Sequence, residues 1–439
     1  MIRRRRLMGT AAALLAAPPL VEKVGAQSAF DWKQCKGQKI EVNFGKSNRA
    51  DVFQAQQKEF EELTGIKVGS EQMAEQQQRT KVVVEFSSGR PSIDVVGVAL
   101  HVQKRLFEKS KWTTDLRPLL ADPAATSPDY DVGDFGGPGV QACTAADGRM
   151  HAIPMNQDVF ILYWNKALLA EKGVAVPRTL DEIYAAARLL TDRPRGIAGF
   201  VARGLKNANV PVFTSFLLGQ NQETISPDKR ALLLETPEAI WAAELYGKLQ
   251  RECGPPGVVG FNWQECQTTF MQGRAALYVD SIGVSAPLID PARSKVAGQI
   301  GFGPLPPGPK GNFTPMFTEG LSIAEASKNK RAAWLYVQWV TGKKMLAETL
   351  RVGASTPPRA SIYDLKEIRA ASALPPEWFV TAQASQKIGR SGLPEIESVT
   401  EFRDTFGIAL TNIIGGADAA TELRKATEAF RPVLARENA

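Results

Sequence analysis

The stretch at residues 151–192, HAIPMNQDVFILYWNKALLAEKGVAVPRTLDEIYAAARLLTD, predicts a strand, a loop and then a helix. Residues 159–164 are apolar on both faces, which is typical of a strand buried inside an α/β domain. Three polar residues, Asn156, Gln157 and Asp158, interrupt the apolar run at its entrance. A buried strand excludes such side chains unless they line a wet cavity, so we expect them to face a cleft.

The last part of the stretch predicts a helix with a defined start. Thr179 is followed three residues later by Glu182, which is the spacing of a capping box. Ile183, Ala186 and Leu190 then recur at helical spacing. A strand that leads through a loop into an amphipathic helix is the repeating unit of an α/β fold.

Three further strands are expected before this stretch. Residues 39–44 and 66–68 flank a helical segment that Asn48 is predicted to cap, a β-α-β start typical of a parallel sheet. Open α/β sheets bind ligands at the carboxyl ends of their strands, which here deliver Asn48 and Arg49. A strand at residues 93–98 delivers His101, which either binds a ligand hydroxyl or bonds the backbone at a helix start.

Length and charge limit the classes of protein that remain. A chain of 439 residues exceeds the roughly 250–300 residues at which one core stops growing, so at least two lobes are expected. The net charge of +7 falls largely in the first 26 residues, where Arg3, Arg4, Arg5 and Arg6 stand. Because no basic run interleaved with aromatic residues follows, a nucleic-acid partner is not expected.

The start of the chain predicts export. Four arginines precede an apolar run of about 14 residues, shorter than the roughly 20 that span a bilayer. Val24, Gly25 and Ala26 form a small-residue cleavage site. The arginines fit either the general secretory route or an incomplete twin-arginine signal, and both stay open.

Several motifs resemble one known family. Residues 153–166 (IPMNQDVFILYWNK) and 177–182 (PRTLDE) resemble a block of the sugar-binding periplasmic solute-binding proteins of ABC importers, the group of maltose-binding-protein-like receptors. Residues 329–339 (NKRAAWLYVQW) resemble a second signature of that family, and residues 60–68 (FEELTGIKV) a third. The resemblance covers nearly the whole chain after residue 26.

The resemblance implies an α/β fold of the two-lobed periplasmic-binding-protein type (type II). Each lobe would be a mostly parallel sheet flanked by helices, with three crossings between the lobes. We expect a signal peptide at residues 1–26, a first lobe at residues 27–157 and 318–355, and a second lobe at residues 158–317 and 356–439. One long helix is expected over residues 328–345.

The resemblance also implies a site between the lobes. Asp158 would stand at the first crossing, and Asp280 would end a strand that faces the cleft. The candidate ligand-binding residues are Asn48, Arg49, His101, Asp158, Asn207, Asp280, Glu319 and Arg359.

The cysteines suggest one disulfide. Cys35, Cys143, Cys253 and Cys266 fit no zinc motif and could oxidise outside the cytoplasm. Cys253 and Cys266 are close in sequence and could close a short loop, so we predict that they are joined. Four cysteines allow three connectivities, among which the sequence does not choose.

The implied function is a periplasmic receptor that captures a sugar, oligosaccharide or polyol and delivers it to an ABC permease. We expect a monomer with no catalytic residues, cofactor or metal. A non-sugar solute such as an organic acid or polyamine is the alternative ligand: Asp158, Asp280 and Glu319 would repel an acid, whereas inward-pointing arginines would attract it.

A secreted glycoside hydrolase is the rival function. Asp158 and Asp280 could form the pair of carboxylates that such an enzyme uses. The sequence, however, contains no Gly-x-Ser-x-Gly or His-Glu-x-x-His motif and has only two histidines. We therefore predict a binding protein.

Overall fold

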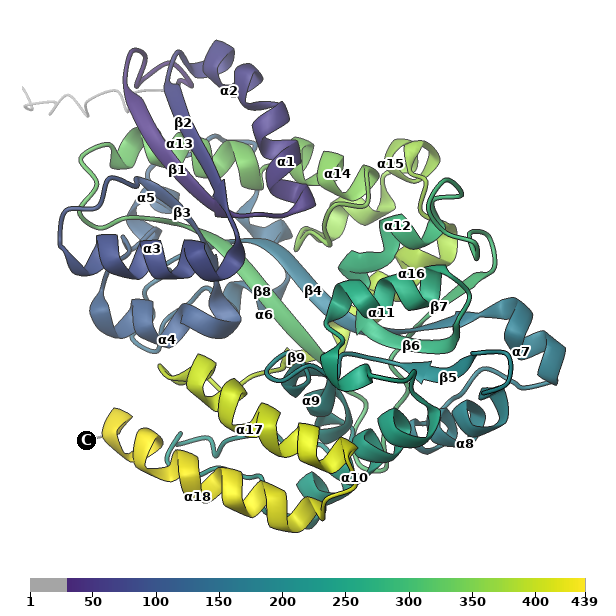
Figure 1. Cartoon of the computed structure of the whole chain (residues 1–439). Helices are drawn as coiled ribbons and strands as arrows, with labels where there is room; N and C mark the ends of the chain where they lie inside the picture. Colours follow the sequence, from purple (N-terminus) through teal and green to yellow (C-terminus); the bar gives the residue numbers. More distant parts are fainter. Residues whose placement is uncertain (1–29, 439) are drawn as a thin grey trace, which may run out of the picture.

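A nine-stranded mixed sheet runs through residues 30–438, the part of the chain that the computed structural model describes (Figure 1). The strand order is β2-β1-β3-β8-β4-β6-β5, with β7 paired to β4 and β9 paired to β8. The strands are β1 (Lys39–Gly45), β2 (Lys67–Met73), β3 (Val95–Ala99), β4 (Ile153–Asn165), β5 (Ala198–Val201), β6 (Ala275–Ser281), β7 (Ile300–Pro304), β8 (Thr314–Ile323) and β9 (Gly389–Ser391).

The first lobe forms around β1, β2 and β3, at the upper left of Figure 1. β1 pairs in parallel with both β2 and β3, as the β-α-β pattern predicts. Its helices are α1 (Asn48–Ala55), α2 (Gln57–Thr64), α3 (Glu75–Ser87), α4 (Leu100–Ser110), α5 (Arg117–Ala121), η1 (Val132–Asp134), α6 (Gly137–Ala142), α13 (Lys330–Thr341) and α14 (Lys343–Arg351). The short helices η5 (Ala360–Asp364) and α15 (Lys366–Ala371) pack against α14.

The second lobe forms around β5, β6 and β7, at the lower right of Figure 1. β5 and β6 are parallel, whereas β6 and β7 pair antiparallel with β4. Its helices are α7 (Lys166–Lys172), α8 (Leu180–Leu190), α9 (Val210–Leu218), α10 (Pro237–Lys248), η2 (Leu249–Cys253), η3 (Val258–Gly260), α11 (Trp263–Met271), η4 (Ile282–Val284), α12 (Ser285–Ile289), α16 (Pro376–Lys387), α17 (Val399–Ile414) and α18 (Ala419–Glu437).

Three segments run side by side between the lobes. The first half of β4 pairs antiparallel with β8, and its second half pairs with β6 and β7. The third segment contains Thr356, whose backbone N–H donates to the side-chain oxygen of Asn156 at 3.0 Å and whose carbonyl accepts from the Gln157 N–H at 2.9 Å. The polar residues that interrupt the stretch at 156–158 therefore lie where all three segments meet.

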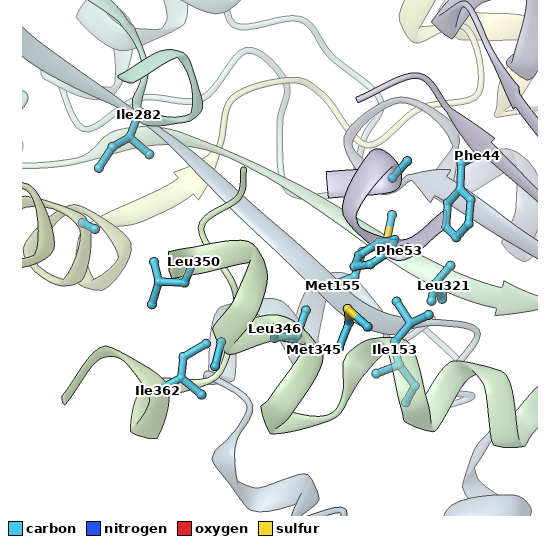
Figure 2. Close-up of a cluster of buried hydrophobic side chains, with 14 of the residues drawn as sticks. Phe44, Phe53, Ile153, Met155, Ile282, Leu321, Met345, Leu346, Leu350 and Ile362 are labelled. Atoms are coloured by element: carbon cyan, nitrogen blue, oxygen red, sulfur yellow. The ribbon is translucent and has the colours of Figure 1, made fainter. Parts of the chain in front are cut away.

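The apolar core continues across these crossing segments. Figure 2 shows Phe44 and Phe53 of the first lobe packed near Ile153 and Met155 of β4. The same buried cluster includes Ile282 in the second lobe. Since residues 159–163 of β4 are buried on both faces, the strand satisfies the prediction of a two-sided buried strand.

Helix ends follow local chemistry, with two departures from expectation. Thr179 caps α8 as predicted, accepting from the Glu182 N–H at 3.2 Å. The cap of α1 is Ser47 rather than Asn48, which is already the first helical residue. The long helix expected over residues 328–345 ends at Thr341, because Gly342 has an extended backbone and α14 begins after it.

Residues 1–26, the predicted signal peptide, lie outside the described residues. Within residues 30–438, no helix combines the length and the apolar character that crossing a membrane requires.

Candidate ligand-binding site

Charged side chains gather on the face of β4 and β8 that meets the starts of α1, α3 and α4. Arg49, in the first turn of α1, forms an ion pair with Glu319 of β8, and their side chains are 15% and 23% exposed. Glu319 also accepts from the Asn156 side-chain amide at 3.3 Å. Burial lowers the pKa of Arg49 to about 10. This end of the site is thus largely enclosed.

Asp158 lies on the same face, opposite Phe317 in the strand pairing. Its carboxylate accepts from the Ser281 hydroxyl and, at 3.2 Å, from the Gly283 N–H, both at the end of β6. Burial raises the pKa of Asp158 above its usual value, and these two bonds oppose that shift. Within residues 30–438, Asp158 makes no ion pair, so its carboxylate keeps acceptor capacity for a further donor.

Arg203 enters the site from the loop after β5 and is held by Asp280. The Arg203 Nε atom lies 3.0 Å from each Asp280 oxygen, and a terminal nitrogen bonds the same carboxylate. Asp280 is fully buried and also accepts from the Tyr278 hydroxyl and the Ser281 N–H, at 3.0 and 2.7 Å. Although burial acts to lower the pKa of Arg203, Asp280 raises it, so this guanidinium stays charged. Its side chain is 16% exposed.

The aromatic rings at the site are already covered. The Arg203 guanidinium lies over the Phe160 ring, 5.2 Å from its centre. The His101 ring meets Phe317 edge-on, with ring centres 5.2 Å apart, and its Nδ1 lies 3.3 Å from the Thr318 carbonyl oxygen. Burial lowers the pKa of His101 to about 3, so His101 is neutral at neutral pH.

The rim of the site carries charges from both lobes. Glu75 and Arg79 of α3 form an ion pair on the first lobe. Arg403 of α17 comes from the second lobe and donates from Nε to the Asn207 carbonyl at 3.1 Å. Burial lowers the pKa of Arg403 to about 10. Asn207 has a positive φ of 62° and bonds Asp404 through its amide, so it orients the Arg403 region rather than facing the cleft centre.

The charges of this cluster balance. Its members are Arg49, Arg79, Arg203 and Arg403 with Glu75, Asp158, Asp280 and Glu319. A neutral ligand with many hydroxyl groups suits such a site, because each hydroxyl both donates to carboxylates and accepts from guanidiniums. Within the described residues, no group of three or more His, Cys, Asp or Glu side chains is arranged to hold a metal ion.

Some of the predicted ligand-binding residues lie together in the structure, and others lie apart from them. Arg49, His101, Asp158 and Glu319 come together on one face of the crossing strands. Asn48 is exposed at the start of α1. Asp280 is fully buried and pairs with the more exposed Arg203. Arg203 was not among the candidate residues. The polar loop at residues 201–209 was the signal that could have identified Arg203.

Arg359 stands apart from the site. It is fully buried in the first lobe and donates to the carbonyls of Thr341, Asp131 and Tyr130 at 2.7–2.8 Å. Its guanidinium also lies 3.9 Å from the centre of the Phe135 ring. With its donors occupied, Arg359 ties α13 to the loop before η1, so we withdraw it from the candidate site.

The predicted disulfide is wrong in this structure, where all four cysteines are buried and free. Cys253 packs in the apolar cluster of α8 and α10, whereas Cys266 packs in the cluster that contains Phe270 and Tyr278. Nearness in sequence did not bring them together, because the intervening residues carry them into different clusters. Burial raises the pKa of both thiols, which also makes them slow to oxidise.

We therefore expect the protein, unfolded without reductant, to take up iodoacetamide at all four cysteines, because none is bonded. Mass spectrometry counts the adducts, and the folded protein serves as the control, with little labelling. A peptide pair joining Cys253 to Cys266 would contradict the structure.

A cavity of about 700 Å³ lies on the opposite side of β8 from this charged face. Met316 and Thr318 line it, and these alternate along β8 with Phe317 and Glu319. His101 stands between the two spaces, since it lines the cavity and also contacts Phe317. Of the predicted site residues, His101 lines this cavity, whereas Arg49, Asp158 and Glu319 do not.

Comparison with known proteins decides the family. Residues 23–347 match the family model described as bacterial extracellular solute-binding protein. The chain belongs to this family. As a solute-binding protein, it is similar to the erythritol/L-threitol-binding protein of Mycolicibacterium smegmatis, at 28% identity over 90% of this chain and 86% of the relative.

Solved structures of solute-binding proteins share the fold. An ABC transporter solute-binding protein from Agrobacterium radiobacter, in complex with ribitol, has a TM-score of 0.80 and 23% identity, covering 91% of this chain and 99% of that one. A maltose-bound T. maritima protein has a TM-score of 0.77 and 21% identity, covering 90% and 99%. The predicted two-lobed α/β fold is therefore confirmed.

Proposed function

We propose that this solute-binding protein is a receptor for a short acyclic polyol, held between Asp158 of the crossing strand and Arg203 of the second lobe. The observation that carries the proposal is the covering of the aromatic rings by charged and polar side chains. Arg203 lies over Phe160 and His101 abuts Phe317, so these rings offer little free face for stacking a sugar ring. Hydroxyl groups would instead meet carboxylates and guanidiniums.

The balance of charge favours a neutral ligand over an organic acid. Arg49 and Arg203 already pair with Glu319 and Asp280, so an incoming carboxylate would have to displace these partners. Asp158 would repel such a ligand directly. A polyamine fits no better, because the same arginines would face its ammonium groups.

The relatives add support for polyols. One is named for binding erythritol and L-threitol, and one structural neighbour holds ribitol. All three compounds are short acyclic polyols, whereas the second structural neighbour holds maltose. Because Arg203 and His101 cover the Phe160 and Phe317 rings of this chain, we favour an acyclic polyol over maltose.

Transport would proceed by closure of the lobes and delivery to a membrane partner. A ligand that bonds both lobes only when they are closed shifts the population toward the closed state. We propose that residues 1–26 direct export to the periplasm and are removed, and that an ABC permease receives the loaded monomer. The proposed lobe boundaries lie near residues 157, 317 and 356, with η5 and α15 remaining against the first lobe.

A calorimetric panel tests the proposal. Erythritol, ribitol and D-mannitol are titrated into the mature protein, with maltose, succinate and spermidine as comparison ligands. We expect one-to-one binding of at least one polyol. Maltose, succinate and spermidine should each bind at least tenfold more weakly than that polyol. Tight binding of succinate or maltose without response to any polyol would refute the proposed class, and release of sugar from a glycoside would support the rival enzyme.

A further inference from the structure

A short turn holds Gly283 beside the carboxylate of Asp158. The turn is η4, whose first and last residues, Ile282 and Val284, are buried in the apolar core (Figure 2 labels Ile282). The Gly283 N–H lies 3.2 Å from the Asp158 carboxylate and 2.9 Å from the Ser281 hydroxyl oxygen, and both accept from it. Asp158 and Gly283 are partly exposed, whereas Ser281 is buried. Solvent therefore reaches these two residues of an otherwise buried turn.

The space beside Gly283 leads to the Asp158 carboxylate. A Cβ atom at residue 283 would lie 3.5 Å from each of the two carboxylate oxygens and 3.1 Å from the Ser281 hydroxyl oxygen. These are its three nearest atoms beyond the chain neighbours of Gly283. A methyl group would fit there if the Ser281 hydroxyl moved by a few tenths of an ångström. Any group that fills this space therefore contacts both oxygens of Asp158.

Neither the backbone nor the packing of the protein requires glycine at this position. Gly283 does not have a positive φ angle, the conformation that favours glycine over other residues. At Gly301, by contrast, a Cβ atom would lie 1.9 Å from the Trp164 ring, so packing excludes a side chain there. Because glycine makes a helix less stable than alanine does, the missing side chain at residue 283 calls for another reason.

We propose that Gly283 is a specificity-determining residue of the polyol site, which leaves room over the Asp158 carboxylate for one carbon of the ligand and its hydroxyl group. Each carboxylate oxygen already accepts one bond, from Ser281 or from Gly283, and can accept a further one. A ligand hydroxyl oxygen would lie about 2.7 Å from such an oxygen. A side chain at residue 283 would fill the same space and exclude the ligand. The inference rests on the proposed function, because it names the part of that site which the ligand fills.

Calorimetry compares the wild-type protein with Gly283→Ala and Gly283→Leu, using the polyol that the wild type binds most tightly among erythritol, ribitol and D-mannitol. The alanine variant is expected to bind at least about tenfold more weakly, as for the loss of one hydrogen bond to a charged group. The leucine variant should show no measurable binding, because its side chain fills more of the space. The urea midpoint of unfolding of Gly283→Ala should stay close to the wild-type value, because alanine suits a helical backbone.

Gly133→Ala is the matched control. Gly133 is likewise the middle residue of a three-residue helix, η1, and does not have a positive φ angle. A Cβ atom there would lie 3.6 Å from a carboxylate oxygen of Asp131, whose partner is Lys343 rather than a residue of the candidate site. This variant should bind the polyol as the wild type does.

A double-mutant cycle separates the covering of Asp158 from a general distortion of the site. In the Asp158→Ala background the carboxylate is absent, so adding Gly283→Ala should weaken binding much less than it does in the wild type. Fully additive losses would overturn the proposal, because residue 283 would then not act through the Asp158 carboxylate.

The affinities also separate the proposal from the function on which it rests. If the wild type binds a polyol and Gly283→Ala binds it equally well, Gly283 does not determine specificity, while the proposed function stands. If the wild type binds none of the three polyols, the proposed function fails and the assignment of Gly283 falls with it.

Discussion

Replacing Asp280 by alanine is expected to lower the free energy of unfolding by about 3–5 kcal/mol, the range for removing one partner of a buried ion pair. Asp280 is fully buried and accepts two-pronged bonds from Arg203. Without it, the Arg203 guanidinium is left without its counter-charge in the protein interior. The orientation of Arg203 over Phe160 is lost as well, so polyol binding falls with stability.

Urea unfolding followed by circular dichroism measures the change, with Glu348→Ala as the matched control. Glu348 holds Arg351 by the same two-pronged geometry, with both distances 2.6 Å, but that pair is partly exposed. The control should cost at most about 1 kcal/mol. If the two variants lose the same free energy of unfolding, the buried pair stabilises the protein no more than the partly exposed pair does.

Replacing Asp158 by alanine is expected to weaken polyol binding by about 1.5–3 kcal/mol, the range for a hydrogen bond to a charged group. The carboxylate has only the Ser281 hydroxyl and the Gly283 N–H as direct hydrogen-bond partners within the described residues. Titration calorimetry with ribitol measures the loss. Asp158→Asn keeps one acceptor oxygen, which can still bond the Gly283 N–H. It should lose part of the affinity, because the charge is gone.

Asp228→Ala is the control for the alanine variant. Asp228 accepts from a hydroxyl and a backbone N–H in the same way, from Ser226 at 2.5 Å and Arg230 at 3.2 Å, but on an exposed loop. Its removal should not change ribitol affinity. If Asp158→Ala binds ribitol as the wild type does, Asp158 is not a ligand-binding residue.

Local patterns were enough to predict much of the fold. The two-sided apolar run at residues 159–164 and the cap at Thr179 are decided by neighbours in sequence, and the structure confirms both. The interruption at residues 156–158 also marked the meeting of the crossing segments, because polar side chains in a buried strand need partners. The break at Gly342 was missed, since the apolar spacing continues through it.

The site could be predicted only in part, because the direction of a side chain depends on packing between distant elements. Every residue of β6 is buried, so its pattern does not reveal which face Asp280 occupies or that Arg203 lies in front of it. Arg359 follows the third crossing but turns into the first lobe toward three carbonyls. The prediction of a disulfide was wrong because packing between distant elements places Cys253 and Cys266 in different apolar clusters.

The most direct test of the account is a crystal structure of the mature protein with ribitol. The account predicts ribitol between the lobes, with hydroxyl oxygens about 2.7–3.2 Å from the Asp158 carboxylate and the Arg203 guanidinium. Ribitol ordered instead in the cavity of about 700 Å³ on the opposite side of β8, with Asp158 and Arg203 making no contact to it, would contradict the account.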